Sequence, residues 1–159
     1  MDRRHFIGQS AAAVGLLAGL STQTKAATLQ KAEILVIGGG YGGATAAKYL
    51  RLFSNNTARV TLIEPNTSFI SCPMSNLVIG GSRTLAEITS PYDTLSKRHG
   101  IKIIQDSVTS IDADKKTVTL ASGKTLRYDK AVVSPGVSLN FKSIEGLAQA
   151  NKDGVTLQA

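Results

Sequence analysis

A glycine-rich loop, GGGYGG at residues 38–43, constrains the fold of this chain more than any other feature. It directly follows AEILVI (residues 32–37), a short apolar run that predicts a strand buried on both faces of a parallel sheet. Residues 44–53 then have helical spacing, and RVTLI (residues 59–63) predicts a second buried strand. Such a unit of strand, loop, helix and strand is typical of a right-handed crossover. We expect its helix to turn Ala47, Leu50 and Phe53 toward the sheet.

The loop carries the spacing Gly38-x-Gly40-x-x-Gly43, and its position between a strand and a helix predicts a dinucleotide site. Gly38 permits the tight turn, Gly40 lets the backbone approach a pyrophosphate, and Gly43 lets the helix pack close to the strand. The pyrophosphate is expected on the free N–H groups at the positive end of the helix. Tyr41 and Gly42 are therefore included in the predicted site.

Glu64 ends the second strand, about twenty residues after the loop, where dinucleotide-binding proteins place an acid. Its carboxylate can accept both hydrogens of a ribose diol, and it would repel a 2′-phosphate. We therefore expect an unphosphorylated adenosine. The alternative is an ordinary glycine-rich turn with a surface acid.

The rest of the chain predicts a third parallel strand, a meander and a return strand. Two short helices are expected at residues 84–88 and 92–99, the second ended by Gly100, with no regular element assigned between residues 66 and 81. Apolar and alternating runs predict the strands. These strands are expected at residues 101–105, 108–111, 117–120, 125–127 and 130–133. The fold class is thus α/β: a Rossmann-like, FAD-binding, three-layer domain with an antiparallel β-meander, here truncated.

The glycine motif does not distinguish NAD from FAD, but the strands after it favour FAD. A meander followed by a strand that ends in a small-residue turn is the order found in two-dinucleotide flavoproteins. The segment from Tyr128 to Gly136 resembles their second FAD fingerprint. We therefore add Ser134, Pro135 and Gly136 to the cofactor site, together with Val108 at the start of the meander.

The first 27 residues have the layout of an export signal. Arg3 and Arg4 precede an uncharged apolar stretch, which is followed by small residues that suit a signal peptidase. The arginine pair before Phe6, with Lys25 near the cleavage site, indicates the twin-arginine route to the periplasm. The alternatives are an uncleaved apolar anchor or a chance arginine pair. We divide the chain into a signal peptide (1–27) and an FAD/NAD(P)-binding domain (28–159), with no stable membrane span in the mature part.

The composition excludes several other classes of protein. The net charge is +7, but the cations beyond the leader are scattered and form no basic block interleaved with aromatic residues, so nucleic acid is not an expected partner. A single cysteine excludes an internal disulfide and multi-cysteine zinc sites, and His5 and His99 leave little material for any metal centre.

Residues 64–81, EPNTSFISCPMSNLVIGG, resemble the flavoprotein subunit of flavocytochrome c sulfide dehydrogenase. The segment Tyr92-Asp93-x-Leu95, the loop ending GGATAAKY and the twin-arginine leader resemble it too. This resemblance implies oxidation of sulfide to sulfur, with electrons passed to a c-type cytochrome subunit. It also implies that Cys72 carries FAD through a thioether to the 8α carbon of the flavin. A sulfide:quinone or other pyridine nucleotide-disulfide-type flavin oxidoreductase remains an alternative, as does a non-catalytic dinucleotide-binding fragment.

Cys72 lies eight residues past Glu64, beside Pro73. A dithiol relay at this place is excluded because Ser68 and Leu77 stand four residues before it and five after it. The alternative for such a cysteine is a small buried hydrophobic residue. The family's redox cysteine pair and its second half are absent from the sequence. We therefore expect the chain to be the N-terminal part of a longer protein, with no catalytic residue of its own.

Overall fold

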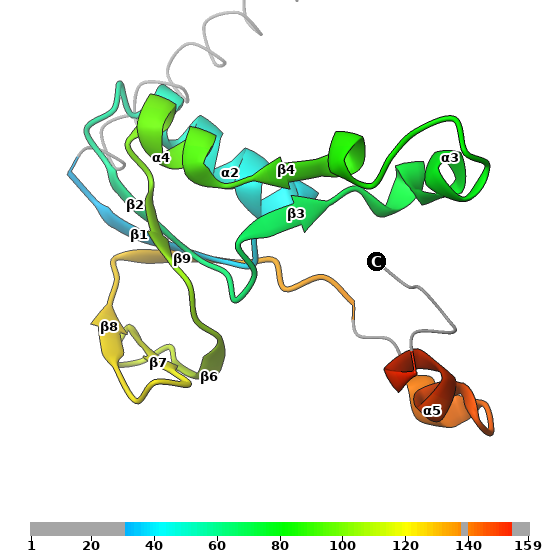
Figure 1. The fold of residues 1–159 in the computed structure, drawn as a ribbon. Coiled ribbons are helices and arrows are strands. Elements are labelled where there is room, and N and C mark those ends of the chain that lie inside the picture. The colour runs from blue at the N-terminus through cyan, green and yellow to red at the C-terminus, as the bar shows by residue number, and fades with distance from the viewer. Residues whose placement is uncertain (1–30, 138–139, 154–159) are drawn as a thin grey trace, which may run out of the picture.

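The computed structural model describes residues 31–137 and 140–153, which form a parallel sheet flanked by two further layers (Figure 1). The predicted signal peptide lies outside the described residues. The sheet has the strand order β5-β2-β1-β9, and all neighbouring strands are parallel. These strands are β1 (Glu33–Ile37), β2 (Arg59–Ile63), β5 (Lys102–Ile104) and β9 (Lys130–Val133).

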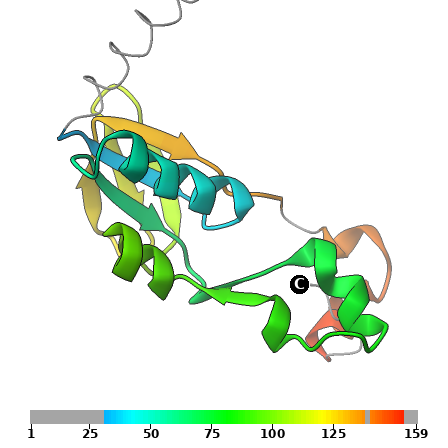
Figure 2. The ribbon, with the colours of Figure 1, turned by 90° about the horizontal axis from the view of Figure 1, so that it is seen from above.

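Helices α2 (Tyr41–Phe53) and α4 (Asp93–His99) cover one face of the sheet, and an antiparallel meander covers the other (Figures 1 and 2). The meander consists of β6 (Val108–Asp112), β7 (Thr117–Leu120) and β8 (Thr125–Arg127). The expected three-layer α/β architecture, the meander and the return strand are therefore confirmed.

Alternate residues of β1 enter two separate cores. Ile34 and Val36 pack with Ala47 on the helix side, whereas Leu35 and Ile37 pack with residues of β7 on the meander side. All four of these apolar β1 residues are buried. This is why the strand reads as a continuous apolar run rather than as an alternating one.

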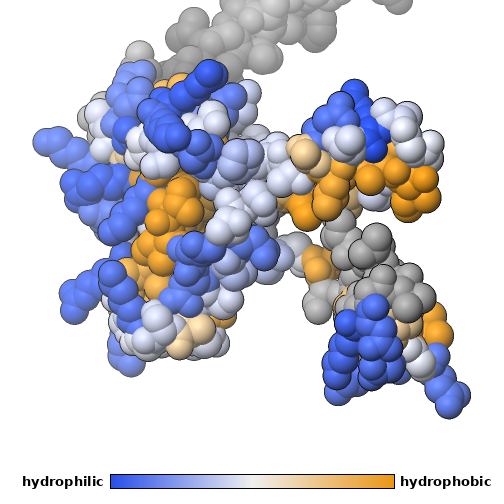
Figure 3. Space-filling view, viewed as in Figure 1, coloured by the Kyte–Doolittle hydropathy of each residue, from blue (hydrophilic) through white to orange (hydrophobic). Residues whose placement is uncertain are grey.

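An arm, residues 68–91, leaves the edge of these layers (Figure 2). Its base is a two-stranded antiparallel ribbon of β3 (Ser68–Ile70) and β4 (Thr89–Pro91). Between the two strands lie the 3₁₀ turn η1 (Cys72–Met74), helix α3 (Ser75–Ile79) and the 3₁₀ turn η2 (Ala86–Ile88). Apolar side chains gather on the arm around α3 (Figure 3), where Ile79 and Leu85 are exposed.

Two sequence expectations about α2 were wrong. The helix begins at Tyr41, three residues earlier than predicted, and Gly42 and Gly43 are therefore part of its first turn. Ala47 is fully buried and Leu50 packs on the core, but Phe53 is 68% exposed and its ring packs on Tyr49.

The remaining boundaries differ little from expectation. Helix α4 ends at His99 and is followed by Gly100 as its C-cap. The left-handed φ of 61° at Gly100 confirms the predicted stop. The predicted helix at residues 84–88 is a 3₁₀ turn followed by β4, and the unassigned tail contains η3 (Phe141–Ser143) and α5 (Leu147–Lys152).

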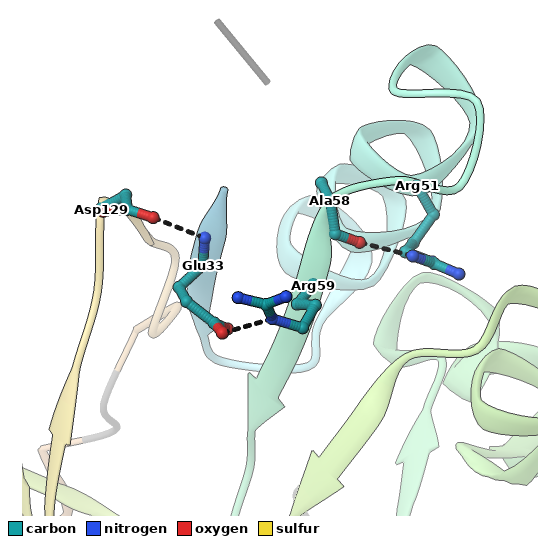
Figure 4. Close-up of polar contacts among 5 residues, drawn as sticks. All are labelled: Glu33, Arg51, Ala58, Arg59 and Asp129. Atoms are coloured by element: carbon teal, nitrogen blue, oxygen red, sulfur yellow. Dashed lines mark hydrogen bonds and ion pairs between the residues drawn. The ribbon is translucent and has the colours of Figure 1, made fainter. Parts of the chain in front are cut away.

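Polar side chains fasten the amino ends of the parallel strands (Figure 4). Asp129 accepts a hydrogen bond of 2.7 Å from the Glu33 N–H, and the Glu33 carboxylate pairs with Arg59. Arg51 of α2 donates to the carbonyl oxygen of Ala58 just before β2. These contacts lie at the opposite end of the strands from the glycine loop, which leaves the carboxyl ends for the candidate site.

Candidate functional site

The glycine loop, Glu64 and the turn after β9 meet at the carboxyl edge of the parallel sheet. The Gly38 N–H donates to the Ile63 carbonyl oxygen at 2.9 Å, and the Ser134 N–H donates to the Ile37 carbonyl oxygen at 2.8 Å. The strand order places β1 between β2 and β9, so segments far apart in sequence join here. This edge is where open α/β sheets bind their ligands.

Two glycines of the loop are required by the protein's own packing. Gly38 has a φ of +95°, and a Cβ atom on it would lie 2.1 Å from the Ser134 carbonyl oxygen. A Cβ atom on Gly43 would lie 1.8 Å from the Gly38 carbonyl oxygen. A Cβ on Gly42 would meet the Ser134 hydroxyl at 2.8 Å. The predicted structural roles of Gly38 and Gly43 are thus visible in the geometry.

Gly40 is different, because no residue in the described part of the chain fills the space beside it. A Cβ atom there would make only an ordinary contact of 3.9 Å with the Phe69 ring, and its φ of −65° suits any residue. Gly40 is also the N-cap of α2, with no side-chain cap and no acidic residue in the first turn. The open space and the uncapped, positive helix end fit an anionic diphosphate.

Glu64 is 8% exposed, and its carboxylate is already engaged by the loop. Oε2 accepts from the Gly39 N–H at 2.7 Å, and Oε1 accepts from the N–H and the side-chain amide of Asn66 at 3.0 and 2.8 Å. A carboxylate offers about four acceptor positions, so about one remains, on Oε2. It can therefore accept one ribose hydroxyl, and accepting both, as the sequence suggested, requires Asn66 to release Oε1.

Tyr92, which immediately precedes α4, supports the loop from the helix side. Its hydroxyl donates to the Gly39 carbonyl oxygen at 3.0 Å, and the side chain is buried in the helix-side core. Burial, and secondarily the nearby Glu64 carboxylate, raise the pKa of Tyr92 to about 12. In the sequence, Tyr92 and Asn66 stand out only as members of the segments that resemble the flavocytochrome c flavoprotein subunit. Nothing in their spacing indicated that they contact the site.

A pocket of about 200 Å³ adjoins the loop on the helix side. Gly40 and Tyr41 line it, together with Phe69 of the arm, Tyr92, and Leu95 of α4. The Tyr41 and Phe69 rings meet edge to face, with their centroids 4.7 Å apart. Among the predicted site residues, only Gly40 and Tyr41 line this pocket.

Cys72 is exposed at the start of η1, so the alternative of a small buried hydrophobic residue is wrong. The preceding Ser71 is buried, and its hydroxyl contacts the Tyr41 hydroxyl. The arm is thereby attached to the first residue of α2 directly before the thiol.

Val108 and the turn after β9 are not among the residues that line the pocket. The Val108 side chain is half-buried and packs on the meander-side core, and Val108 pairs with Leu120. Ser134 and Pro135 lie against Gly38, and Gly136 has a φ of +78° in open space. The structure thus places the turn after β9 beside the glycine loop, whereas the Val108 side chain packs against the meander-side core.

Within residues 31–137 and 140–153, no group of three His, Cys, Asp or Glu side chains could hold a metal ion. None of the helices in those ranges is long and apolar enough to cross a membrane.

A parallel sheet whose glycine loop, second-strand acid and return strand converge in this way defines a Rossmann-like dinucleotide-binding domain. A family model described as pyridine nucleotide-disulphide oxidoreductase matches residues 32–158. The chain therefore belongs to the pyridine nucleotide-disulphide oxidoreductase family.

Several sulfide-oxidising proteins are similar to the chain. A sulfide-quinone reductase of Aquifex aeolicus is 35% identical over 69% of this chain and 25% of its own length. A sulfide dehydrogenase flavoprotein chain of flavocytochrome c from Chlorobaculum thiosulfatiphilum is 53% identical, over 29% of this chain and 94% of the compared sequence.

Among solved structures, the sulfide:quinone oxidoreductase of Aquifex aeolicus matches with a TM-score of 0.64 at 34% identity, over 69% of this chain and 25% of that one. The chain thus spans about a quarter of the length of this relative.

Proposed function

We propose that the chain is the FAD-binding part of a flavin-dependent sulfide oxidoreductase. The observation that carries the proposal is the open space beside Gly40 at an uncapped helix end, with Glu64 buried at the next strand end. The diphosphate would lie on the N–H groups at the start of α2, and the adenosine ribose would lie at Glu64 Oε2. The bound flavin supplies two-electron redox chemistry, while the residues described here bind and orient it.

We further propose that the whole protein oxidises sulfide to sulfur and passes the two electrons to a c-type cytochrome subunit. In that reaction HS⁻ gives elemental sulfur, a proton and two electrons. The sequence resemblance and the similarity to a flavocytochrome c flavoprotein chain support this acceptor. The second candidate is transfer to a quinone, which the similarity to sulfide-quinone reductases supports.

The experiment is a sulfide-dependent activity assay on the protein expressed from its own gene. Reduction of an added c-type cytochrome is followed by haem absorbance, and reduction of a soluble ubiquinone analogue is followed in parallel. Haem reduction without quinone reduction is the expected result. Quinone reduction alone establishes the second candidate, and the absence of both with bound FAD refutes a sulfide oxidase.

The Cys72 thiol is proposed as the covalent attachment point of the flavin. Its exposed position, one residue after the Ser71 contact with Tyr41, supports this role because the thiol is reachable beside the glycine loop. The sulfur forms a bond to the 8α carbon, with loss of the thiol proton and of one hydrogen from the flavin methyl group. The two electrons released pass to an acceptor such as oxygen. Anchoring of the diphosphate makes the step effectively intramolecular.

Export to the periplasm by the twin-arginine route is proposed from Arg3, Arg4 and the apolar stretch after them. Changing both arginines to lysine should retain the unprocessed protein in the cytoplasm, as fractionation and blotting would show. Normal processing and export of that double variant would refute the route.

A further inference from the structure

Tyr92 and Glu64 hold Gly39 from its two sides. The Gly39 N–H donates to Glu64 Oε2 at 2.7 Å, and the Gly39 carbonyl oxygen accepts from the Tyr92 hydroxyl at 3.0 Å. A Cβ atom on Gly39 would lie 2.5 Å from the Tyr92 hydroxyl oxygen. Residue 39 is therefore enclosed by these two side chains and its backbone has a single orientation.

This orientation determines where the next backbone donor points. The peptide bond between Gly39 and Gly40 is trans, since no described peptide bond is cis. In a planar trans peptide the C=O and N–H groups point in opposite directions. Because the Gly39 carbonyl oxygen points at Tyr92, the Gly40 N–H points away from Tyr92 and from the core. Gly40 is the N-cap of α2, so this donor stands at the helix end beside the open space.

The Tyr92 hydroxyl remains a donor over the whole range of pH in which proteins work. Its side chain is 6% exposed and lies in the apolar helix-side core, with the Glu64 carboxylate as the charged group opposite it. Both surroundings oppose formation of a phenolate and raise the pKa of Tyr92 to about 12. The hydrogen bond to the Gly39 carbonyl oxygen is therefore not switched by pH near neutrality.

We infer that Tyr92 is a positioning residue for the diphosphate of the bound dinucleotide, acting through the Gly39–Gly40 peptide. This role requires no contact between Tyr92 and the cofactor. Its hydroxyl fixes the carbonyl oxygen, and the rigid peptide then presents the Gly40 N–H to the phosphate oxygens. The inference rests on the proposed dinucleotide site and adds to it a residue from the opposite side of the loop.

The test compares Tyr92→Phe with Tyr49→Phe, which removes the hydroxyl of an exposed tyrosine on α2. Binding of ADP and of adenosine is measured by calorimetry on the protein expressed from its own gene with Cys72→Ser and freed of flavin, so that no covalent cofactor fills the site. Loss of one neutral hydrogen bond predicts about threefold to tenfold weaker ADP binding by Tyr92→Phe. Adenosine, which lacks the diphosphate, should bind with unchanged affinity, and Tyr49→Phe should behave as wild type toward both ligands.

Equal weakening of ADP and adenosine would overturn the inference, because a general loss of structure affects both. Unchanged ADP binding would overturn it too. The backbone amide shifts of Gly39 and Gly40 provide a second readout that does not depend on ligand, and they should move in Tyr92→Phe while those of the meander do not. Wild-type protein that binds neither ADP nor FAD would refute the proposed function, whereas wild-type binding without discrimination by Tyr92→Phe refutes the inference alone.

Discussion

The carbonyl oxygen of Ser134 lies 2.1 Å from the point that a Cβ atom on Gly38 would occupy. The contact joins the first turn of the glycine loop to the end of β9, ninety-six residues later in the chain. The loop and the return strand therefore pack as one unit, and the shape of the site depends on both.

Gly38→Ala should strongly destabilise the protein. The new Cβ atom meets backbone rather than a movable side chain, and the residue keeps a left-handed φ of +95°. We expect a loss of about 2–4 kcal/mol in the free energy of unfolding, measured by urea denaturation. Gly123→Ala is the matched control, because φ is +83° there and a Cβ atom would have no atom of the described residues within 4 Å, its own chain neighbours aside. Equal losses in the two variants would show that the Ser134 contact contributes nothing.

Gly40→Ala should weaken FAD binding and leave the stability of the protein close to that of wild type. Its Cβ atom meets only the Phe69 ring at 3.9 Å and its φ of −65° is ordinary, so the urea midpoint should stay close to wild type. The methyl group would occupy the space proposed for the diphosphate. FAD binding, measured by fluorescence quenching in the Cys72→Ser background and compared with Cys72→Ser alone, should weaken at least about tenfold. Unchanged FAD affinity would place the diphosphate elsewhere.

Glu64→Ala should weaken non-covalent flavin loading by about tenfold to a hundredfold, since a charge-assisted hydrogen bond contributes roughly 1.5–3 kcal/mol. It should also lower stability, because the Gly39 N–H loses its acceptor. Asn66→Ala is the informative control, since it removes the side-chain amide, frees one acceptor position on Oε1 and keeps both the carboxylate and the backbone N–H of residue 66. Flavin titration should show unchanged or tighter binding in that variant, and weakening comparable to Glu64→Ala would contradict a ribose at this carboxylate.

Cys72→Ser should abolish covalent flavin attachment while leaving non-covalent binding intact. The exposed thiol is removed, and the loop that would hold the diphosphate is untouched. The measurement is acid unfolding of the protein expressed from its own gene, followed by separation of protein and free flavin. Yellow colour should remain on wild-type protein and wash away from Cys72→Ser. Complete release from the wild type would contradict the attachment.

Acid should remove the stabilisation that Asp106 gives to the meander. The Ser122 hydroxyl donates to Asp106 Oδ2 at 2.5 Å, and this bond is the main cause that lowers the pKa of Asp106 from its ordinary 3.8. A carboxyl with a lowered pKa in the folded state stabilises fully above its unfolded value, and the effect is lost as pH falls through the folded value. The gap in urea midpoint between wild type and Asp106→Asn should therefore narrow from pH 6 to pH 2. A constant gap would refute the linkage.

Most of the sheet could be predicted from the sequence because its strands read as apolar runs, and β1, which lies between β2 and β9, is buried on both faces. Residues 59–63 and 130–133 match β2 and β9, and the alternating meander strands match equally well. The arm could not be predicted in this way, since β3 and β4 pair across the intervening 3₁₀ turns and α3. No short turn joins these two strands, unlike β7 and β8, so no hairpin pattern marks the pair in the sequence.

The glycine loop and Glu64 could be predicted from the sequence, but Tyr92 and Asn66, which contact them, could not. Glycine spacing identified Gly38, Gly40 and Gly43 because Gly38 and Gly43 have no room for a Cβ atom and Gly40 leaves open the space proposed for the diphosphate. Tyr92 contacts Gly39 across 53 positions, and nothing local marks such a tertiary contact. The early start of α2 at Tyr41 has a similar reason, because the close approach of Gly43 to Gly38 favours helix despite the low intrinsic propensity of glycine.

The division of β1 between two cores has a consequence for engineering this domain. A residue inserted within β1 would exchange the helix-facing and meander-facing side chains from that point onward, since the side-chain period is two. The turn at residues 113–116 is exposed along its whole length. It joins β6 to β7 in the meander and is not part of the parallel sheet that carries the glycine loop. A peptide tag or a fluorophore placed in that turn would therefore report on the domain without displacing the dinucleotide site.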